Sequence, residues 1–202
     1  IECVMNTGAF KFREKTWLLI RDAERPPQNP GKVSLPILTE SGESKIIEFE
    51  ENDPVRDTSD PRKFSNGQNT YLSTISHLRL MCSDDGTHFY KPEGIPDIIR
   101  SKGAYETFGI EDCRVSFFEG QYHLTYTQVS ENGVGVGLMK TKDWASFEKY
   151  DMMLMPHNKD CALFEEKING KYYALNRPSG IGLGGNYIWI SSSFDLIHWG
   201  EH

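Results

Sequence analysis

The chain contains three segments in which apolar and polar residues alternate with a period of two and which reverse direction at a polar pair. The segments and their turn pairs are 9–20 at Glu14-Lys15, 114–126 at Glu119-Gly120 and 162–175 at Asn169-Gly170. Alternation on both sides of a short polar turn is typical of a β-hairpin. The pattern therefore predicts an all-β chain of antiparallel strands, with no helix longer than about two turns outside one insertion.

A second pattern recurs three times: a hydroxyl residue, an aspartate two positions later and an aromatic residue four positions after that. Its copies are Ser83, Asp85 and Phe89; Thr141, Asp143 and Phe147; and Ser193, Asp195 and Trp199. The aspartate of such a turn can accept hydrogen bonds from its own backbone. We expect the aromatic side chain to pack between neighbouring sheets.

The spacing of these copies indicates the length of the repeating unit. Phe89 and Phe147 are 58 residues apart, and Phe147 and Trp199 are 52 apart. This period fits a four-stranded blade of a β-propeller and is too long for ankyrin or leucine-rich repeats. We therefore predict one β-propeller domain over residues 1–202, with about three blades present. Because a closed ring needs at least about four blades, we expect the chain to belong to a longer protein or to close with another chain.

A loop insertion at about 22–69 separates the first hairpin from the first aspartate turn, and it is rich in proline and charged residues. Insertions on one face of a repeat commonly carry functional surface. We therefore expect this insertion to form a wall of the binding site.

Composition limits the partners of the protein. The net charge is −7 and no run of basic residues occurs, which argues against nucleic acid. No apolar stretch approaches the roughly 18 to 20 residues that span a bilayer, so we expect a soluble protein, with no compartment indicated. Cysteines lie far apart and do not form a C-x-x-C pair, so we expect free thiols at Cys3, Cys82, Cys113 and Cys161.

Several familiar catalytic patterns can be set aside. Gly133, Gly135 and Gly137 alternate, but no helix pattern follows, so we expect a strand passing close to the propeller axis or a ligand, not a dinucleotide loop. The histidines lack the spacing of metal ligands, so no metal site is expected. The serines at 191–193 lack a nucleophile elbow.

Polar residues at the starts of equivalent strands remain as a candidate site. They are Asn6, Asp112 and the run 157–160, with Arg21 and Arg177 at the ends of the return strands. Equivalent positions in successive blades face one central cavity, although such residues can also simply satisfy strand ends. Asp112 is the strongest candidate for catalysis, because a carboxylate with a cation two residues on can have a fixed orientation and a tuned pKa.

Five motifs carry a resemblance to a known family: Asn6-Thr7-Gly8-Ala9, Gly109-Ile110-Glu111-Asp112-Cys113-Arg114, Asn158-Lys159-Asp160, Lys167-Ile168-Asn169-Gly170-Lys171-Tyr172 and Asp195-Leu196-Ile197-His198-Trp199. In this order they resemble glycoside hydrolase family 130, the β-mannoside phosphorylases and β-1,2-mannosidases. The resemblance covers essentially the whole chain. It implies a five-bladed β-propeller, of which about two blades are absent here, and an enzyme that cleaves β-1,2- or β-1,4-mannosidic linkages of mannose-containing oligosaccharides with inversion.

The resemblance also implies roles for individual residues. In the family the acid acts through a sugar hydroxyl, and the only co-substrate beyond the sugar is inorganic phosphate, so no cofactor is expected. The roles that we assign are proton donation by Asp112, substrate binding by Asn6, Arg21, Glu111 and Asp160, and phosphate binding by Lys159 and Arg177.

The chain departs from the family pattern at three positions, with Cys113 and Glu165 in place of proline and Asn176 in place of histidine. The last change removes a ring that could help to hold an anion. Phosphorolysis needs a cationic pocket, whereas hydrolysis needs a carboxylate that acts as a base opposite the acid. Candidate bases are Glu131, Glu165 and Glu166. A carbohydrate-binding propeller without catalysis, an inactive fragment and self-association as a homo-oligomer stay open as alternatives.

Overall fold

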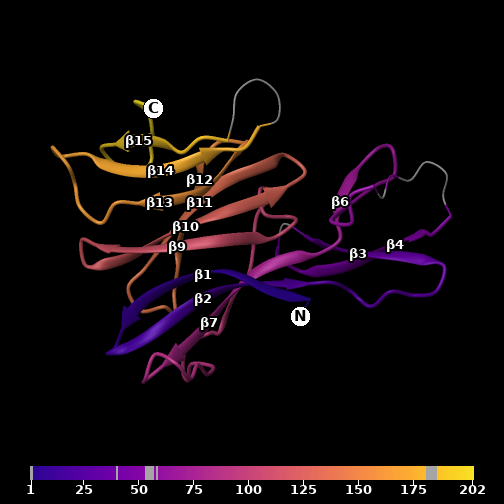
Figure 1. The fold of residues 1–202 in the computed structure, drawn as a ribbon, viewed down its shortest axis with the longest axis horizontal. Coiled ribbons are helices and arrows are strands. Elements are labelled where there is room, and N and C mark those ends of the chain that lie inside the picture. The colour runs from indigo at the N-terminus through magenta and orange to yellow at the C-terminus, as the bar shows by residue number, and fades with distance from the viewer. Residues whose placement is uncertain (1, 40, 53–56, 58, 181–185) are drawn as a thin grey trace.

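The computed structural model describes residues 2–39, 41–52, 57, 59–180 and 186–202, and the regular structure in them is β-strand (Figure 1). The strands are β1 (Cys3–Phe12), β2 (Lys15–Glu24), β3 (Lys32–Leu38), β4 (Ser44–Glu50), β5 (Lys63–Ser65), β6 (Thr70–Leu72), β7 (Ile75–Ser83), β8 (Ile98–Ile99), β9 (Ile110–Phe118), β10 (Gln121–Ser130), β11 (Gly133–Thr141), β12 (Glu148–Leu154), β13 (Asn158–Leu163), β14 (Tyr172–Pro178) and β15 (Trp189–Ser193). The all-β prediction is confirmed for these residues. In this described part of the chain, no helix has the length and hydrophobicity needed to cross a membrane.

The strands form three large sheets and two small ones. The first sheet has the order β1-β2-β7-β8, the second β12-β11-β10-β9 and the third β13-β14-β15, and neighbouring strands are antiparallel. The three predicted hairpins are confirmed. The first one turns at Arg13-Glu14, not at Glu14-Lys15, because Lys15 already pairs with Phe12 in the ladder. No sheet closes into a ring within the described residues.

Two hydrophobic cores hold the large sheets together, with the second sheet between the first and the third (Figure 1). Fully buried members are Leu19, Leu78 and Leu124 in the first core, and Leu138 and Ala174 in the second. Burying a leucine of this kind contributes about 1.5 to 3 kcal/mol. The cores therefore fix the sheets face to face, and β9 contacts both β1 and β13.

The aspartate turn has the same hydrogen bonds in all three sheets. The hydroxyl residue accepts from the backbone N–H three positions later, at 2.8 Å for Ser83 and 2.9 Å for Thr141 and Ser193. The predicted capping role of the aspartate is confirmed, since its Oδ1 accepts from the backbone N–H groups two and three positions later.

The residue that fills the space between the sheets differs from the expectation. Phe147 and Trp199 pack only at the edge of the cores. The residue directly after the aspartate goes deeper: Trp144 is 0% exposed and Leu196 4%. Both have a positive φ, 62° and 67°, which turns the side chain away from the turn, and Trp144 stacks on Phe10 of β1 at 4.0 Å.

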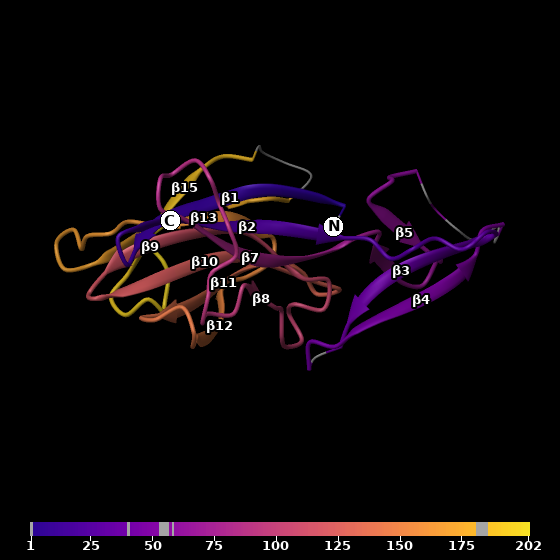
Figure 2. The same ribbon diagram turned by 90° about the horizontal axis from the view of Figure 1, so that it is seen from below.

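The insertion projects from one end of the first sheet as two small hairpins, β3–β4 and β5–β6 (Figures 1 and 2). It occupies 25–74, because β2 continues to Glu24 and β7 begins at Ile75. Residues 40, 53–56 and 58 of the predicted segment lie outside the described residues. Phe49 packs against Phe64 with ring centroids 4.7 Å apart, so the insertion has a small apolar cluster of its own.

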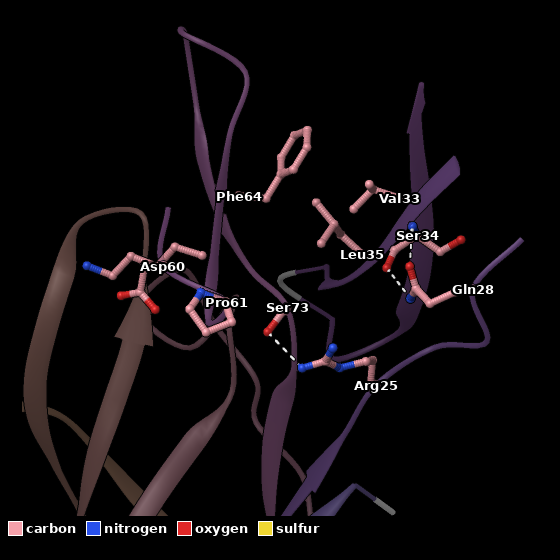
Figure 3. Close-up of a pocket in the computed structure, with 10 residues that line it drawn as sticks. Arg25, Gln28, Val33, Ser34, Leu35, Asp60, Pro61, Phe64 and Ser73 are labelled. Carbon is pink, nitrogen blue, oxygen red and sulfur yellow. Dashed lines mark hydrogen bonds between the residues drawn. The ribbon is translucent and has the colours of Figure 1, made fainter. Parts of the chain in front are cut away.

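A hollow of about 120 Å³ lies inside the insertion (Figure 3). Gln28 closes one side of it, because its Nε2 donates to the Ser34 carbonyl at 2.9 Å and its Oε1 accepts from Ser34 N at 3.1 Å. On another side, Arg25 donates to the Ser73 hydroxyl at 3.4 Å. The Arg25–Ser73 bond ties the two ends of the insertion together where it leaves the first sheet.

Candidate active site

The first strand of each large sheet carries the same β-bulge. In β1, Met5 pairs with Arg21 and Gly8 pairs with Leu19, so one extra residue separates the β1 partners. Identical shifts occur in β9 between Glu111 and Arg114 and in β13 between Lys159 and Ala162. Each bulge places one polar residue in the left-handed region, with φ of 45° for Asn6, 51° for Asp112 and 53° for Asp160. The sequence repeat therefore produces three equivalent polar side chains.

Left-handed backbone costs an L residue roughly 1 to 2 kcal/mol, and Asn and Asp tolerate it best because their short side chains hydrogen-bond locally. The bulges thus select these residue types. Bulges also re-aim side chains, and here two of the three meet: Asn6 Nδ2 donates to Asp112 Oδ1 at 2.9 Å.

Asp112 lies at the centre of the cluster and is 8% exposed. Its Oδ1 accepts from Asn6 and also from Arg21 Nη1 at 3.1 Å. Its Oδ2 has no hydrogen bond to any described residue. The carboxyl group is therefore held through one oxygen, and its other oxygen is left without a partner among the described residues.

Arg21 bridges the first and second sheets. Its Nη2 donates to Glu111 Oε1 at 2.6 Å, and its Nε donates to Ser76 Oγ at 3.1 Å. Ser76 in turn donates to Glu111 Oε1 at 3.3 Å. Burial raises the pKa of Glu111, and the positive charges of Arg21 and Lys159 oppose this rise. Two carboxyl groups thus share one forked cation.

The third sheet contributes a second charged group. Arg177 donates to Asp160 Oδ2 through Nε at 2.8 Å and Nη2 at 2.5 Å. Lys159 pairs with Arg177 in the ladder, and its ammonium group makes no hydrogen bond to a described residue, although its charge acts on Glu111. The structure therefore brings Lys159 of the third sheet within electrostatic range of Glu111 of the second, whereas Arg177 pairs within its own sheet.

Asn176 is buried at 1% exposure, and its amide is engaged inside the protein. Its Oδ1 accepts from Asn158 Nδ2 at 2.9 Å, and its Nδ2 donates to Ser191 Oγ at 2.7 Å. Ser191 Oγ also lies 2.8 Å from His202 Nδ1. The imidazole of His202, from another part of the chain, thus lies close to Asn176, the position at which the family pattern has a histidine.

The three carboxylates considered as bases lie in different places. Glu165 Oε1 accepts from Phe117 N at 2.8 Å, so it lies at the far end of β9 from Asp112, and Glu166 is exposed in the same turn. Glu131 is exposed in the β10–β11 turn, at the end of the second sheet that carries Asp112. No described contact joins any of the three to Asp112.

The alternating glycines lie in strand β11, as predicted, and within the described residues they are closely approached by neighbouring side chains. A Cβ at Gly137 would lie 2.5 Å from the Tyr126 ring, and one at Gly135 would lie 3.0 Å from Met152. The four cysteines are free thiols as expected, and burial raises the pKa of Cys161 to about 12.

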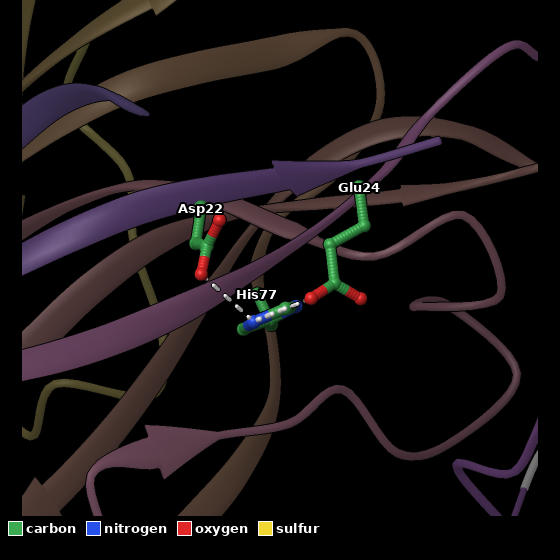
Figure 4. A group of neighbouring side chains, drawn as sticks. All are labelled: Asp22, Glu24 and His77. Carbon is green, nitrogen blue, oxygen red and sulfur yellow. Dashed lines mark ion pairs between the residues drawn. The ribbon is translucent and has the colours of Figure 1, made fainter. Parts of the chain in front are cut away.

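One group of side chains has the composition of a metal site, which the sequence analysis did not anticipate. Asp22, Glu24 and His77 place one ligand atom each within 4.8 Å of one another (Figure 4). Asp22 already pairs with Arg79 at 2.6 Å, and this guanidinium supplies the positive charge that a metal would bring. We interpret the group as a buried ion-pair cluster behind Arg21.

Comparisons with known proteins identify the family of the chain. Residues 43–202 match the family model Glyco_hydro_130, described as β-1,4-mannooligosaccharide phosphorylase. The β-1,2-mannobiose phosphorylase of Listeria innocua serovar 6a is 38% identical over 98% of this chain and 57% of its own length. The β-1,4-mannooligosaccharide phosphorylase of Ruminococcus albus is 35% identical over 45% of this chain and 28% of its own.

Solved structures of related proteins have the same fold. The structure of Listeria innocua β-1,2-mannobiose phosphorylase in complex with β-1,2-mannobiose superimposes with a TM-score of 0.88, at 38% identity, over 98% of this chain and 57% of that one. The chain thus spans a little over half the length of this relative. A structure of a hydrolase that targets β-1,2 mannosidic linkages in Candida mannan shares the fold, with a TM-score of 0.64 at 17% identity over 98% of this chain and 48% of that one. On the family match and the 38% identical relative, the chain belongs to glycoside hydrolase family 130.

Proposed function

We propose that the complete protein cleaves β-mannosidic linkages of mannooligosaccharides by phosphorolysis with inversion, and that Asp112 donates the proton. The observation that carries this proposal is the one-sided hold on the Asp112 carboxyl group. Asn6 and Arg21 fix Oδ1, so a proton on Oδ2 can be directed at a hydroxyl or a leaving oxygen of the sugar. The names of the related phosphorylases support the substrate class.

An inverting cleavage needs an acid on one face of the sugar ring and a nucleophile on the other. Phosphate is already an anion and needs no base. We assign phosphate binding to Lys159 and Arg177. Among the described residues, the Lys159 ammonium group is unpaired and Arg177 Nη1 has no hydrogen bond. Glu165 and Glu166, at the far end of the sheets, are poorly placed to activate water. Glu131 lies nearer but has no described contact with Asp112, and both points favour phosphorolysis over hydrolysis.

Sugar binding falls to the same cluster. Asn6 and Arg21 reach the mannose unit next to Asp112, and Glu111 and Asp160 set the charge and direction of the two arginines. The insertion leaves the first sheet only three residues beyond Arg21, so we assign it the outer wall of the sugar site.

We further propose that these sheets are three blades of a five-bladed β-propeller. Leu175 and Ile190 pair across β14 and β15 and are 38% and 46% exposed. Paired apolar side chains on an open sheet face are normally covered by another layer. A further sheet on this face would continue the order in which the first three are packed.

The test is an incubation of the full-length protein with β-1,2-mannobiose and, separately, β-1,4-mannobiose, each with and without inorganic phosphate. We expect mannose 1-phosphate only when phosphate is present. Free mannose in equal yield without phosphate would replace phosphorolysis by hydrolysis, with Glu131 as the first base to test. Binding of either sugar without any product would favour a carbohydrate-binding protein.

A further inference from the structure

Glu106 is a buried carboxylate outside the cluster around Asp112, and it is 2% exposed. Its Oε1 accepts from the Tyr126 hydroxyl at 2.8 Å and from Gln128 Nε2 at 3.1 Å. Its Oε2 accepts from Lys149 Nζ at 2.6 Å and from Lys102 N at 2.7 Å. Four donors therefore converge on one carboxyl group. Burial and the neighbouring Glu106 charge raise the pKa of Tyr126, so this hydroxyl keeps its proton.

The backbone of Glu106 leads directly into the candidate site. Its carbonyl accepts from Gly109 N at 2.9 Å, which closes the turn before β9. Gly109 has a φ of 107°, and a Cβ there would lie 2.4 Å from the Ser76 carbonyl oxygen. Only glycine can pass this closely. The turn is thus pressed against Ser76, the residue whose hydroxyl contacts Glu111 and Arg21.

A second connection runs through β10. Tyr126 and Gln128, which both donate to Glu106, flank Thr127 in sequence, and Thr127 is the ladder partner of Glu111. The β9 bulge begins at Glu111 and contains Asp112. Glu106 therefore holds the strand opposite the bulge by its side chain and the turn before the bulge by its backbone.

We infer that Glu106 is a positioning residue that fixes the β9 bulge and thereby the direction in which Asp112 delivers its proton. This inference rests on the proposed function, because it presupposes that Asp112 is the acid. Replacing Glu106 by Gln removes the charge facing Lys149 and exchanges one acceptor oxygen for a donor nitrogen, so at least one of the four hydrogen bonds is lost. A displacement of about 1 Å at a reacting group can cost about 10²-fold in rate.

The experiment compares Glu106→Gln with the matched control Glu119→Gln in the full-length protein. Glu119 also binds a tyrosine hydroxyl, that of Tyr172 at 2.8 Å, and a lysine, Lys167 at 2.8 Å, but it lies in the β9–β10 turn at the far end of the second sheet. Both variants are assayed with phosphate on mannobiose and on nitrophenyl mannoside, whose leaving group needs no proton.

For Glu106→Gln we expect a loss of about 10-fold to 100-fold in kcat on mannobiose and a change of less than about threefold on nitrophenyl mannoside. Glu119→Gln should change neither rate by more than about threefold. Equal losses on both substrates, or no loss on mannobiose, would overturn the inference, because general damage to the fold does not depend on the leaving group.

Two further variants separate the possible failures. Asp112→Asn is run in the same assay, and if it shows no dependence on the leaving group, the proposed function itself fails. If it does show this dependence and Glu106→Gln does not, only the inference is wrong. Should Glu106→Gln not fold, Tyr126→Phe removes a single donor to Glu106; the same leaving-group dependence in weaker form supports the inference, and its absence overturns it.

Discussion

Arg21 and Arg177 occupy equivalent positions, each opposite the first residue of a bulge, yet their side chains have partners in different sheets. Arg21 reaches out of the first sheet to Glu111 and Asp112 of the second. Arg177 stays within the third sheet and pairs with Asp160 of its own bulge. The difference follows from residue type, because the first bulge offers Asn6, which cannot pair with a cation. The same β-bulge thus gives a cluster shared between two sheets around Arg21 and an ion pair within one sheet at Arg177.

The strongest test of this comparison replaces each of the two equivalent aspartates by asparagine. Asp112→Asn keeps size and hydrogen-bonding shape but removes the transferable proton, so kcat on mannobiose should fall about 10²-fold to 10⁴-fold. Asp160→Asn should cost less than about tenfold, because among the described residues the Asp160 side chain pairs with Arg177 alone. Steady-state rates with phosphate measure both. Turnover by Asp112→Asn at the wild-type rate would make Glu111 the next candidate for the acid.

The next test exchanges the two arginines for lysine, which keeps the charge and loses the fork. Arg21→Lys should lower kcat/KM for mannobiose about 10²-fold, because it can no longer hold Glu111 and Asp112 together. Arg177→Lys should mainly raise the KM for phosphate, by about tenfold. Varying each substrate separately gives the two constants. Equal effects of the two variants on phosphate would show that the arginines do not have separate tasks.

A third test removes the insertion, which has no counterpart between β14 and β15 in the described residues. Glu24 and Ile75 are ladder partners, so a two-residue turn can join β2 to β7 in place of 25–74. We expect the KM for mannobiose to rise about tenfold, with the β signal in circular dichroism largely kept. Collapse of that signal would show that the insertion supports the first sheet instead of the sugar site.

The smallest effect concerns the packing between the second and third sheets. His123 is 0% exposed and stacks on Phe118 at 3.7 Å, and burial lowers its pKa to about 4. The unfolded chain therefore binds a proton first as the pH falls. Stability is complete above about pH 6.5 and declines toward pH 4, with a loss of about 1 kcal/mol by pH 5.5.

Urea denaturation at pH 7.5 and pH 5.5 measures this loss. His123→Phe should remove this part of the pH dependence, whereas His198→Ala, at an exposed turn, should leave it in place. An unchanged slope in His123→Phe would assign the pH dependence to other groups.

Much of the site followed from repetition in the sequence. The repeat predicts equivalent positions for Asn6, Asp112 and Asp160, and the three bulges give the backbone reason, although of the three only Asn6 and Asp112 are joined by a described contact. The positions of Glu165 and Glu166 could also have been inferred, since both follow the end of a strand that begins next to Asp160. Sequence reasoning treated them by residue type and overlooked strand direction.

Other contacts had no local signal. Ser76 follows a 50-residue insertion, and its meeting with Arg21 depends on the register of β2 and β7. Asp22 and His77 are ladder partners 55 positions apart, so the spacing of histidines along the chain could not reveal them. Glu106 lies in a loop without periodicity, and three of its four donors come from residues 20 to 43 positions away. Burial of this kind arises only from the tertiary fold.

The residue directly after the aspartate in each turn acts as a spacer between two sheets, and its size differs from turn to turn. A tryptophan separates the first and second sheets at Trp144, a leucine separates the second and third at Leu196, and at Gly86 in the first sheet only Thr16 lies near the place that a Cβ would take. Trp144 and Leu196 lie at the end of the sheets opposite Asp112, so a change in their size alters the packing between two sheets without touching the candidate site.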